Sequence, residues 1–278
     1  MRQPVFFLIA CLLMIPAAAP CHEVLVLGIH PYKPNNVLQK NFRPLADYVQ
    51  EALGYAVEIR VGTNYQDHLH AISSGAVDLA FLGPAGYVNL TKLFGEHPLL
   101  GKIVTNGEPV FRGHIVVAEN SSLTSLKELG GKRLAFVNLF STMYLVPYAM
   151  LKQAGLKVED LSGQAFLNSH QNVALGILAG DFAAGAVKEE VFLKFTDRGL
   201  RSLVPTMEIP EHVFVANSRL DPELIAAAST ALMNLKSTEI GVKILQSIKS
   251  SCTAVVAAED ADYDPLRDLL KYLDKDLE

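Results

Sequence analysis

The chain has 278 residues, of which 50% are hydrophobic and 19% are charged. This composition can build a large core in one or two lobes, and it excludes a disordered chain. The 24 Lys and Arg residues against 29 Asp and Glu residues give a formal net charge of -5, and the sequence contains no run of four or more basic residues. Nucleic acid is therefore not an expected partner.

Residues 1–21 have the three parts of a secretory signal. Arg2 supplies one positive charge, an apolar stretch runs from Val5 to Ile15, and small residues follow up to Cys21. An apolar stretch of about 11 residues is too short for a membrane-spanning helix, which needs about 20. We therefore expect residues 1–21 to be a signal peptide that directs the chain to the periplasm.

The mature N-terminus has two alternatives. Signal peptidase could cut between Cys21 and His22, because Ala19 and Cys21 are the small residues that it favours at these positions. Alternatively, Cys21 is the lipidated first residue of an anchored protein, although residues 18–21 depart from the usual bacterial lipobox. In both cases Cys252 has no cysteine partner in its own chain, and we expect it to be a buried apolar residue.

From residue 24 on, strand and helix patterns alternate. Residues 24–29 are almost continuously apolar, which predicts a strand covered on both faces. Apolar residues at helical spacing then run to Leu53 and stop at Gly54, which predicts an amphipathic helix. The following patterns predict a strand at 57–61, a helix at 65–74 and a strand at 77–82. The βαβαβ order indicates a parallel sheet.

An internal repeat suggests a second, similar lobe. Residues 72–80 and 177–185 both read as a helix end, a glycine turn and a strand of small and apolar residues. The alternative is that any helix-to-strand turn has this pattern. Strand-like segments at 113–118 and 211–216 flank the second copy, as if the chain left one lobe, built another and returned. We expect a two-lobe α/β fold with a two-stranded hinge, in which lobe 1 is 22–111 plus 213–278 and lobe 2 is 112–212.

Patterns typical of catalysis or metal binding are missing. The sequence contains no GxGxxG, GxxxxGK[ST], HExxH or GxSxG motif. His68 and His70 are two residues apart on a predicted helix, so their side chains point in different directions. The acidic run from Asp260 is followed by Pro265 where a calcium loop needs glycine. We therefore expect neither an enzyme nor a metal or other cofactor.

Hydrogen-bond donors gather at three predicted strand-to-helix junctions. The first opens a helix at Ser141 and Thr142, the second carries Tyr87, and the third has His170 in the first turn of a helix. The free N-H groups of a helix N-terminus can bind an oxyanion. Alternatively, Ser141 is a simple N-cap and His170 is a solvated or core histidine.

The three junctions should face one cleft, because they lie at the carboxyl ends of parallel strands. None of them carries Lys or Arg, so we expect neutral donors rather than a cluster of cations to hold an anion. A histidine that donates to a dianion gains from being protonated, so binding through His170 should weaken as pH rises.

Four segments carry a resemblance to a known family. They are residues 42–48, 77–84, 126–137 and 169–175. Over roughly residues 24–272 the chain resembles the periplasmic phosphate/phosphite/phosphonate-binding proteins of ABC importers, which have the type II periplasmic binding protein fold. The resemblance implies two lobes that close over a small phosphorus oxyanion, with a permease of the inner membrane as the partner.

The resemblance also implies a set of ligand-binding residues. Ser141, Thr142 and the N-H groups of their helix would hold the anion, while Tyr87, His170 and Tyr32 would complete the contacts. Glu190 lies where some members bind an amino group on the ligand's tail. The helix start departs from the family's usual Ser-x-Ser-Gly-Tyr, because Met143 stands directly before Tyr144 and the glycine is missing.

Two other functions remain open at this point. The same fold serves as the outer sensor of signalling proteins, and it also binds other small anions such as sulfonates. For the importer we expect a small anionic ligand, an ABC permease, no nucleic acid and a monomeric chain.

Overall fold

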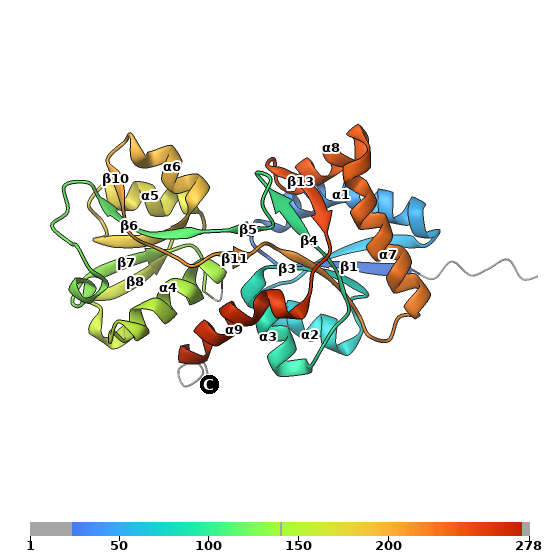
Figure 1. Ribbon diagram of the computed structural model, residues 1–278, viewed down its shortest axis with the longest axis horizontal. Helices are drawn as coiled ribbons and strands as arrows, with labels where there is room; N and C mark the ends of the chain where they lie inside the picture. Colours follow the sequence, from blue (N-terminus) through green and yellow to red (C-terminus); the bar gives the residue numbers. More distant parts are fainter. Residues whose placement is uncertain (1–23, 140, 274–278) are drawn as a thin grey trace, which may run out of the picture.

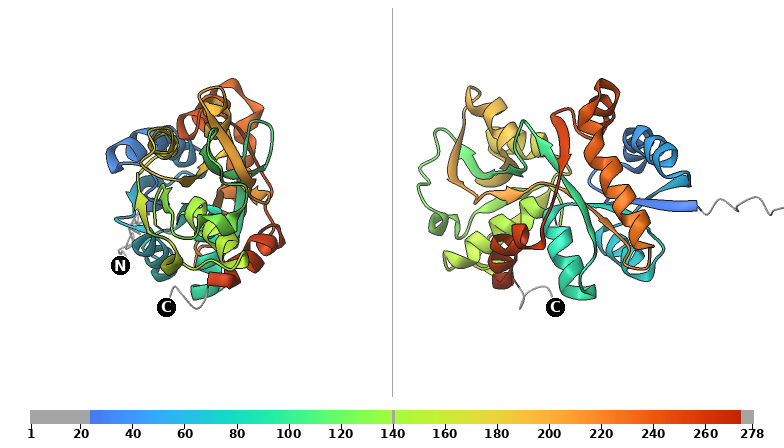
Figure 2. Two further views of the ribbon diagram at one scale, coloured as in Figure 1. Left: turned by 90° about the vertical axis from the view of Figure 1, so that its left-hand side faces the viewer. Right: turned by 45° about the vertical axis from the view of Figure 1, so that its right-hand side comes forward.

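The computed structural model describes residues 24–139 and 141–273, so the expected signal peptide and Cys21 lie outside the described residues. Figure 1 shows two lobes side by side, each built around its own sheet. Views from other sides show helices around both sheets (Figure 2). The expected two-lobe α/β fold is confirmed.

Lobe 1 contains a six-stranded sheet in the order β13-β4-β12-β3-β1-β2. Its strands are β1 (Val24–Ile29), β2 (Ala56–Val61), β3 (Leu79–Leu82), β4 (Leu99–Thr105), β12 (Val213–Ala216) and β13 (Cys252–Val256). β1 pairs in parallel with β2 and β3, as the βαβαβ order predicts, whereas β12 and β13 run antiparallel to their neighbours. The helices are α1 (Asn35–Leu53), α2 (Tyr65–Ser74), α3 (Pro84–Phe94), α7 (Pro222–Asn234) and α8 (Glu239–Ile248).

The helix ends in lobe 1 follow the sequence signals. α1 ends at Gly54, whose φ of 75° lies in the left-handed region that glycine adopts without steric cost. α2 begins at Asn64, whose side chain accepts a hydrogen bond from the backbone N-H of Asp67 at 2.8 Å. These caps fix where each helix meets the sheet, and therefore where the loops at the strand ends lie.

Lobe 2 contains a five-stranded sheet in the order β10-β6-β9-β7-β8. Its elements are β6 (Gly113–Ala118), β7 (Arg133–Phe136), β8 (Gly163–Phe166), β9 (Ala184–Lys188), β10 (Leu200–Pro205), α4 (Thr142–Gln153), α5 (His170–Leu178) and α6 (Glu189–Thr196). β7 pairs in parallel with β8 and β9, so the loops after β7 and β9 leave the sheet at the same edge. Each sheet thus has three neighbouring parallel strands at one side, β3-β1-β2 in lobe 1 and β9-β7-β8 in lobe 2.

The chain crosses between the lobes at β5 (Val110–Phe111) and β11 (Ile209–Pro210). These two short strands pair antiparallel, Ile209 with Phe111 and Pro210 with Val110, and Figure 1 shows them between the lobes. The segments 113–118 and 211–216, which the sequence suggested as the crossing itself, instead contain β6 and β12, which are strands inside the two sheets. The crossing pair comes directly before each of them.

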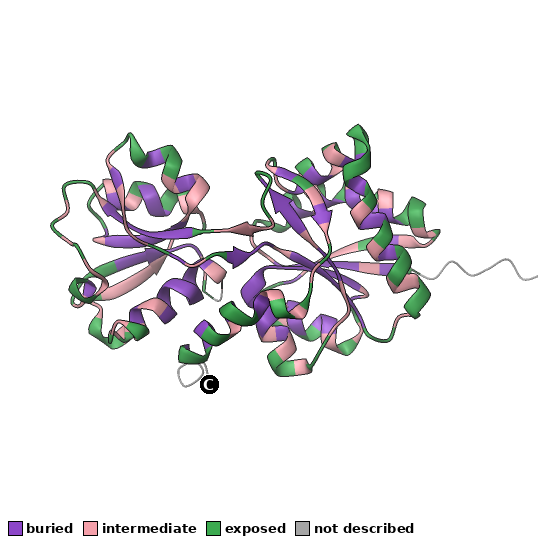
Figure 3. Ribbon diagram, in the orientation of Figure 1, coloured by how far each residue is buried: buried purple, intermediate pink, exposed green. Residues whose placement is uncertain are grey.

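The buried core continues from one lobe into the other. Buried strands lie at the centre of each lobe and exposed residues on the outer faces of the helices (Figure 3). One apolar cluster joins residues of α2 and α3 in lobe 1 with residues of α4 in lobe 2 and of the last helix, α9 (Asp264–Leu270). The sequence predicts that α9 packs on lobe 1; it contacts both α3 and α4. Cys252 is fully buried and unpaired, as expected.

Within the described ranges, no helix combines the length and the apolar character that a membrane crossing requires.

Candidate functional site

A cavity of about 270 Å³ lies between the two lobes. Its walls form where β1, β3, β7 and β9 end and where α4 and α5 begin, which is the edge at which parallel sheets bind ligands. Lobe 1 and the crossing segments contribute His30, Tyr32, Lys33, Tyr65, Phe81, Gly83, Ile103, Phe111, His212, Ile248 and Lys249 to the lining. Lobe 2 contributes Val137, Asn138, Ser141, Thr142, Met143, Asn168, Ser169, His170, Lys188 and Glu190.

The N-terminus of α4 opens into this cavity without a side-chain cap. Ser141 occupies the N-cap position in an extended conformation, but its hydroxyl donates to the backbone oxygen of Asn138 at 2.8 Å. The N-H groups of Thr142 and Met143 come too early in the helix to find an intrahelical acceptor. Ser141 is therefore not a simple N-cap, and the positive end of the α4 dipole faces the cavity.

Thr142 connects the helix starts of the two lobes. Its hydroxyl oxygen accepts a hydrogen bond from the backbone N-H of Ala85 in α3, at 3.2 Å. The hydroxyl proton of Thr142 remains available to an acceptor in the cavity. Met143, which stands directly before Tyr144 where the motif of the resembled family has glycine, lines the cavity with an apolar side chain.

His170 lines the cavity as a neutral imidazole. The backbone N-H of Lys188 donates to its Nδ1 at 3.3 Å, which leaves the proton on Nε2. Burial, followed by the positive charges of Lys188 and Lys249, lowers the pKa of His170 to about 3. His170 can therefore donate one hydrogen bond at neutral pH, but it does not carry a positive charge there.

The expectation of a site without cations is wrong. Lys33, Lys188 and Lys249 all line the cavity. They come from the loop after β1, the end of β9 and the end of α8, so no single junction in the sequence displays them together. Their convergence depends on the closed arrangement of the two lobes.

Glu190 is already paired with one of these lysines. The Lys249 ammonium lies 3.5 Å from Glu190 and 3.4 Å from the buried Glu211. Glu211 also accepts hydrogen bonds from Thr105 at 2.5 Å and from the backbone N-H of His212 at 3.2 Å. Burial opposes ionisation of Glu211, but Lys188, His212 and Lys249 outweigh it and hold its pKa below the ordinary value. Both carboxylates are thus already partners of a protein cation.

Of the two tyrosines that were expected to contact the ligand, only one lines the cavity. Tyr32 lines the cavity and stacks on His30, with ring centroids 4.7 Å apart. Tyr87 is not among the lining residues: its ring is buried against Tyr263, and its hydroxyl donates to Asp260 at 2.8 Å. The prediction that Tyr87 reaches the ligand has to be corrected, because its side chain on α3 points toward the C-terminal segment.

Several lining residues were not predicted from the sequence. The histidines His30 and His212 follow β1 and precede β12, and their rings lie 5.3 Å apart. Burial lowers the pKa of both imidazoles, so that they are neutral at ordinary pH. Tyr65 at the start of α2 also lines the cavity. In the sequence each of these residues stands alone beside an apolar run, and only the fold brings them together.

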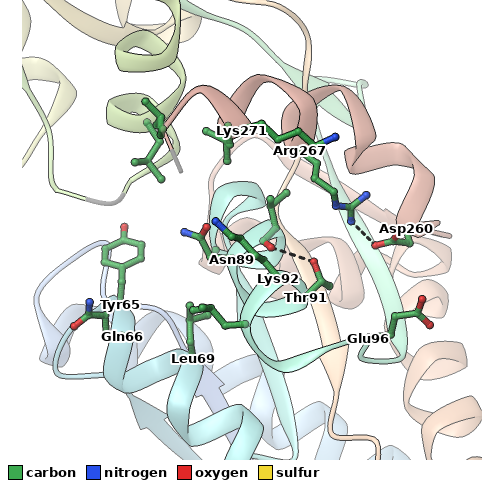
Figure 4. A pocket seen from close by; sticks show the side chains of 16 residues that line it. Tyr65, Gln66, Leu69, Asn89, Thr91, Lys92, Glu96, Asp260, Arg267 and Lys271 are labelled. Atoms are coloured by element: carbon green, nitrogen blue, oxygen red, sulfur yellow. Dashed lines mark hydrogen bonds and ion pairs between the residues drawn. The ribbon is translucent and has the colours of Figure 1, made fainter. Parts of the chain in front are cut away.

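A larger hollow of about 590 Å³ lies away from these helix starts, between α2, α3 and α9 (Figure 4). Two of its cations already have partners: Arg267 pairs with Asp260 at 2.7 Å, and Lys271 pairs with Asp268 at 2.7 Å. Size alone therefore does not make it a ligand site. No group of three or more side chains suited to metal binding occurs in residues 24–139 and 141–273.

The chain was compared with known proteins. The family model for the periplasmic, phosphonate substrate-binding protein of ABC transporters matches residues 27–263. Over 270 residues the chain is 28% identical to the phosphate-import protein PhnD of Mycolicibacterium smegmatis, an alignment that covers 88% of this chain and 84% of that protein.

Solved structures share the fold at lower identity. PhnD1 of Prochlorococcus marinus, solved with methylphosphonate, has a TM-score of 0.76 at 22% identity, with 91% of this chain and 98% of that chain covered. The aliphatic sulphonate binding protein SsuA of Escherichia coli has a TM-score of 0.61 at 16% identity, with 92% and 93% covered. Because the family match spans most of the chain, this protein belongs to the family of periplasmic substrate-binding proteins of ABC phosphonate transporters, and it is a transport protein rather than an enzyme.

Proposed function

We propose that this protein captures a small phosphorus oxyanion in the cavity between its lobes and delivers it to an ABC permease. The observation that carries this proposal is the N-terminus of α4, which opens into the cavity while Ser141 leaves it uncapped. Such a helix end binds an oxyanion through N-H groups and its dipole. Lysines in the same wall add full positive charge.

The ligand we propose has no amino group. Glu190 was expected to receive the amine of an aminoalkylphosphonate, but its carboxylate is paired with the ammonium of Lys249. An amine on the ligand would have to displace Lys249, which also pairs with the buried Glu211. Phosphate, phosphite and methylphosphonate fit this site better than 2-aminoethylphosphonate. The names of two relatives, a phosphate importer and a protein solved with methylphosphonate, support the same ligand class.

The mature protein we propose is a monomer that acts without nucleic acid. Residues 1–21 are then a signal peptide, either removed or cut so that Cys21 is lipidated. Lobe 1 comprises 22–111 plus 213–278, and lobe 2 comprises 112–212.

Calorimetric titration of the mature chain tests the ligand. We expect binding of phosphate, phosphite or methylphosphonate, and weaker binding of 2-aminoethylphosphonate and methanesulfonate. A chain that binds methanesulfonate but none of the phosphorus oxyanions would contradict the proposal. Tighter binding of 2-aminoethylphosphonate than of methylphosphonate would contradict the role given to Glu190.

Two hydroxyl variants test the site. We expect Thr142→Ala, which removes a hydroxyl proton available to the ligand, to lower the affinity by about 10-fold to 100-fold, for a loss of about 1.5 to 3 kcal/mol. Ser141→Ala should lower it less, because the Ser141 hydroxyl donates to the backbone oxygen of Asn138. Thr238 is a matched control, because its hydroxyl accepts from the N-H of Gly241 at the start of α8. Thr238→Ala should cost about 1 kcal/mol of stability and leave the affinity unchanged. If all three variants bind alike, the hydroxyls of Ser141 and Thr142 do not contact the ligand.

A further inference from the structure

The ammonium of Lys188 lies in the cavity beside the strand that crosses between the lobes. Lys188 is the last residue of β9 in lobe 2, and its backbone N-H holds His170 at the start of α5. Its Nζ lies 4.1 Å from the ring centroid of Phe111 on the crossing strand β5. The side chain therefore lines the same cavity as the starts of α4 and α5.

Within the described part of the chain, no carboxylate lies at ion-pair distance from the Nζ of Lys188. The nearby Glu190 and Glu211 are paired with Lys249, and Glu211 attracts Lys188 only from a longer distance. Burial lowers the pKa of Lys188, and the attraction of Glu211 offsets this only in part. Contact with an aromatic face replaces part of the lost hydration.

The position of Lys188 at the start of a helix further disfavours its positive charge. Lys188 is the N-cap residue of α6, at the positive end of that helix dipole. A cation at a helix N-terminus is disfavoured, and acidic residues are preferred there. A partly buried lysine at such a place is stabilised by an anion that enters the cavity.

We propose that Lys188 pairs directly with the bound oxyanion, and that it makes the protein select doubly charged phosphorus oxyanions over singly charged anions such as sulfonates. This inference rests on the proposed function and specifies the charge of its ligand.

The charges around the cavity agree with a dianion. Lys188, Lys249, Glu190 and Glu211 have a formal sum of zero before a ligand enters. The N-termini of α4, α5 and α6 each contribute about half a positive charge. Lys33 at the exposed rim adds one more, so that a bound dianion leaves less positive charge uncompensated than a monoanion does.

Two ligands of equal shape isolate this effect. Methylphosphonate and methanesulfonate have the same geometry, and at a pH where methylphosphonate is doubly ionised they differ by one charge. We expect the wild-type protein to prefer methylphosphonate, and Lys188→Met to reduce that preference by about 10-fold in calorimetric titrations. Lys188→Arg should keep the preference, because it keeps the charge.

Lys194 provides the matched control. It is exposed in the same lobe and does not line the cavity, so Lys194→Met changes the net charge equally and should leave the preference within about 2-fold of wild type. Chemical acetylation of the wild-type protein gives a second measurement that needs no variant. Saturating methylphosphonate should slow the acetylation of Lys188, read by mass spectrometry, and not that of Lys194.

The outcomes separate this inference from the function on which it rests. If the wild-type protein binds none of the phosphorus oxyanions, the proposed function fails and the inference fails with it. If it binds methylphosphonate but Lys188→Met keeps the full preference over methanesulfonate, or acetylation of Lys188 is unaffected by the ligand, the inference alone is overturned.

Discussion

His170 illustrates how a single contact sets the chemistry of a site residue. Its identity and its place at the start of α5 were predicted from the sequence, but its charge was not. The backbone N-H of Lys188 occupies Nδ1, and burial lowers the imidazole's pKa to about 3. The expected dependence of binding on protonated His170 is therefore replaced by a neutral donor, Nε2-H.

The pH dependence of a His170→Ala variant tests this assignment. We expect the variant to bind methylphosphonate about 10-fold more weakly than wild type, through the loss of one hydrogen bond to a charged ligand. Because a group with a pKa of about 3 stays neutral from pH 6 to 8, the ratio of the two affinities should be the same at both ends of that range. A ratio that grows toward pH 6 would show that His170 binds as a cation.

The helices and strands of this protein differ in how well they can be predicted from the sequence. α2 and β1 carry local signals, such as the Asn64 cap, and they form where predicted. α1 ends at Gly54 as predicted, but it begins at Asn35, before the apolar spacing that indicated it. The start of α4 is also predicted by the sequence, because a strand pattern, the two hydroxyl residues Ser141 and Thr142 and a helix pattern follow one another. The lysines of the cavity were missed because they lie on β9, α8 and the loop after β1, and their meeting depends on contacts distant in sequence. Tyr87 was misplaced because its partners Asp260 and Tyr263 belong to the last segment of the chain.

Strand β9 leaves no room for a side chain at Gly185. A Cβ there would lie 2.6 Å from the backbone oxygen of Ala135 in β7 and 2.7 Å from Val173 Cγ1. The backbone oxygen of Ala135 is held in the sheet and cannot move away from an added Cβ as the end of a flexible side chain could. Gly185→Ala should therefore lower the free energy of unfolding in urea by about 1 to 3 kcal/mol. It should also weaken binding, since β7 and β9 carry Asn138 and Lys188 into the cavity.

Gly86 in α3 is the control for this glycine. A Cβ at Gly86 meets Leu82 at 3.6 Å, which is ordinary contact. Gly86→Ala lies inside a helix and should stabilise the protein by up to about 1 kcal/mol. If both substitutions destabilised the protein equally, the close approach of β7 and β9 would not be the reason that position 185 requires glycine.

The whole molecule is held in its closed arrangement by more than the crossing strands. The hydrogen bond between Ala85 and Thr142 and the ion pair between Lys249 and Glu190 connect the two sides of the cavity. Away from the cavity, α9 and the turn after it pack against α4 of lobe 2 as well as α3 of lobe 1. A motion that opens the cavity must therefore either carry α9 with α4 or break that packing.

The packing of the last segment should couple the unfolding of the two lobes. Leu273 is fully buried in the apolar cluster that joins α3, α4 and α9, whereas Leu93 on α3 is 63% exposed. We expect wild type to unfold in one calorimetric transition, with equal calorimetric and van't Hoff enthalpies. Leu273→Ala should cost about 2 to 5 kcal/mol and raise the ratio of calorimetric to van't Hoff enthalpy above one, because one lobe then unfolds before the other.

Leu93→Ala is the control, which should change the stability by less than about 0.5 kcal/mol and keep the single transition. Two separate transitions in wild type, or equal effects of the two leucine variants, would show that the crossing strands alone connect the lobes.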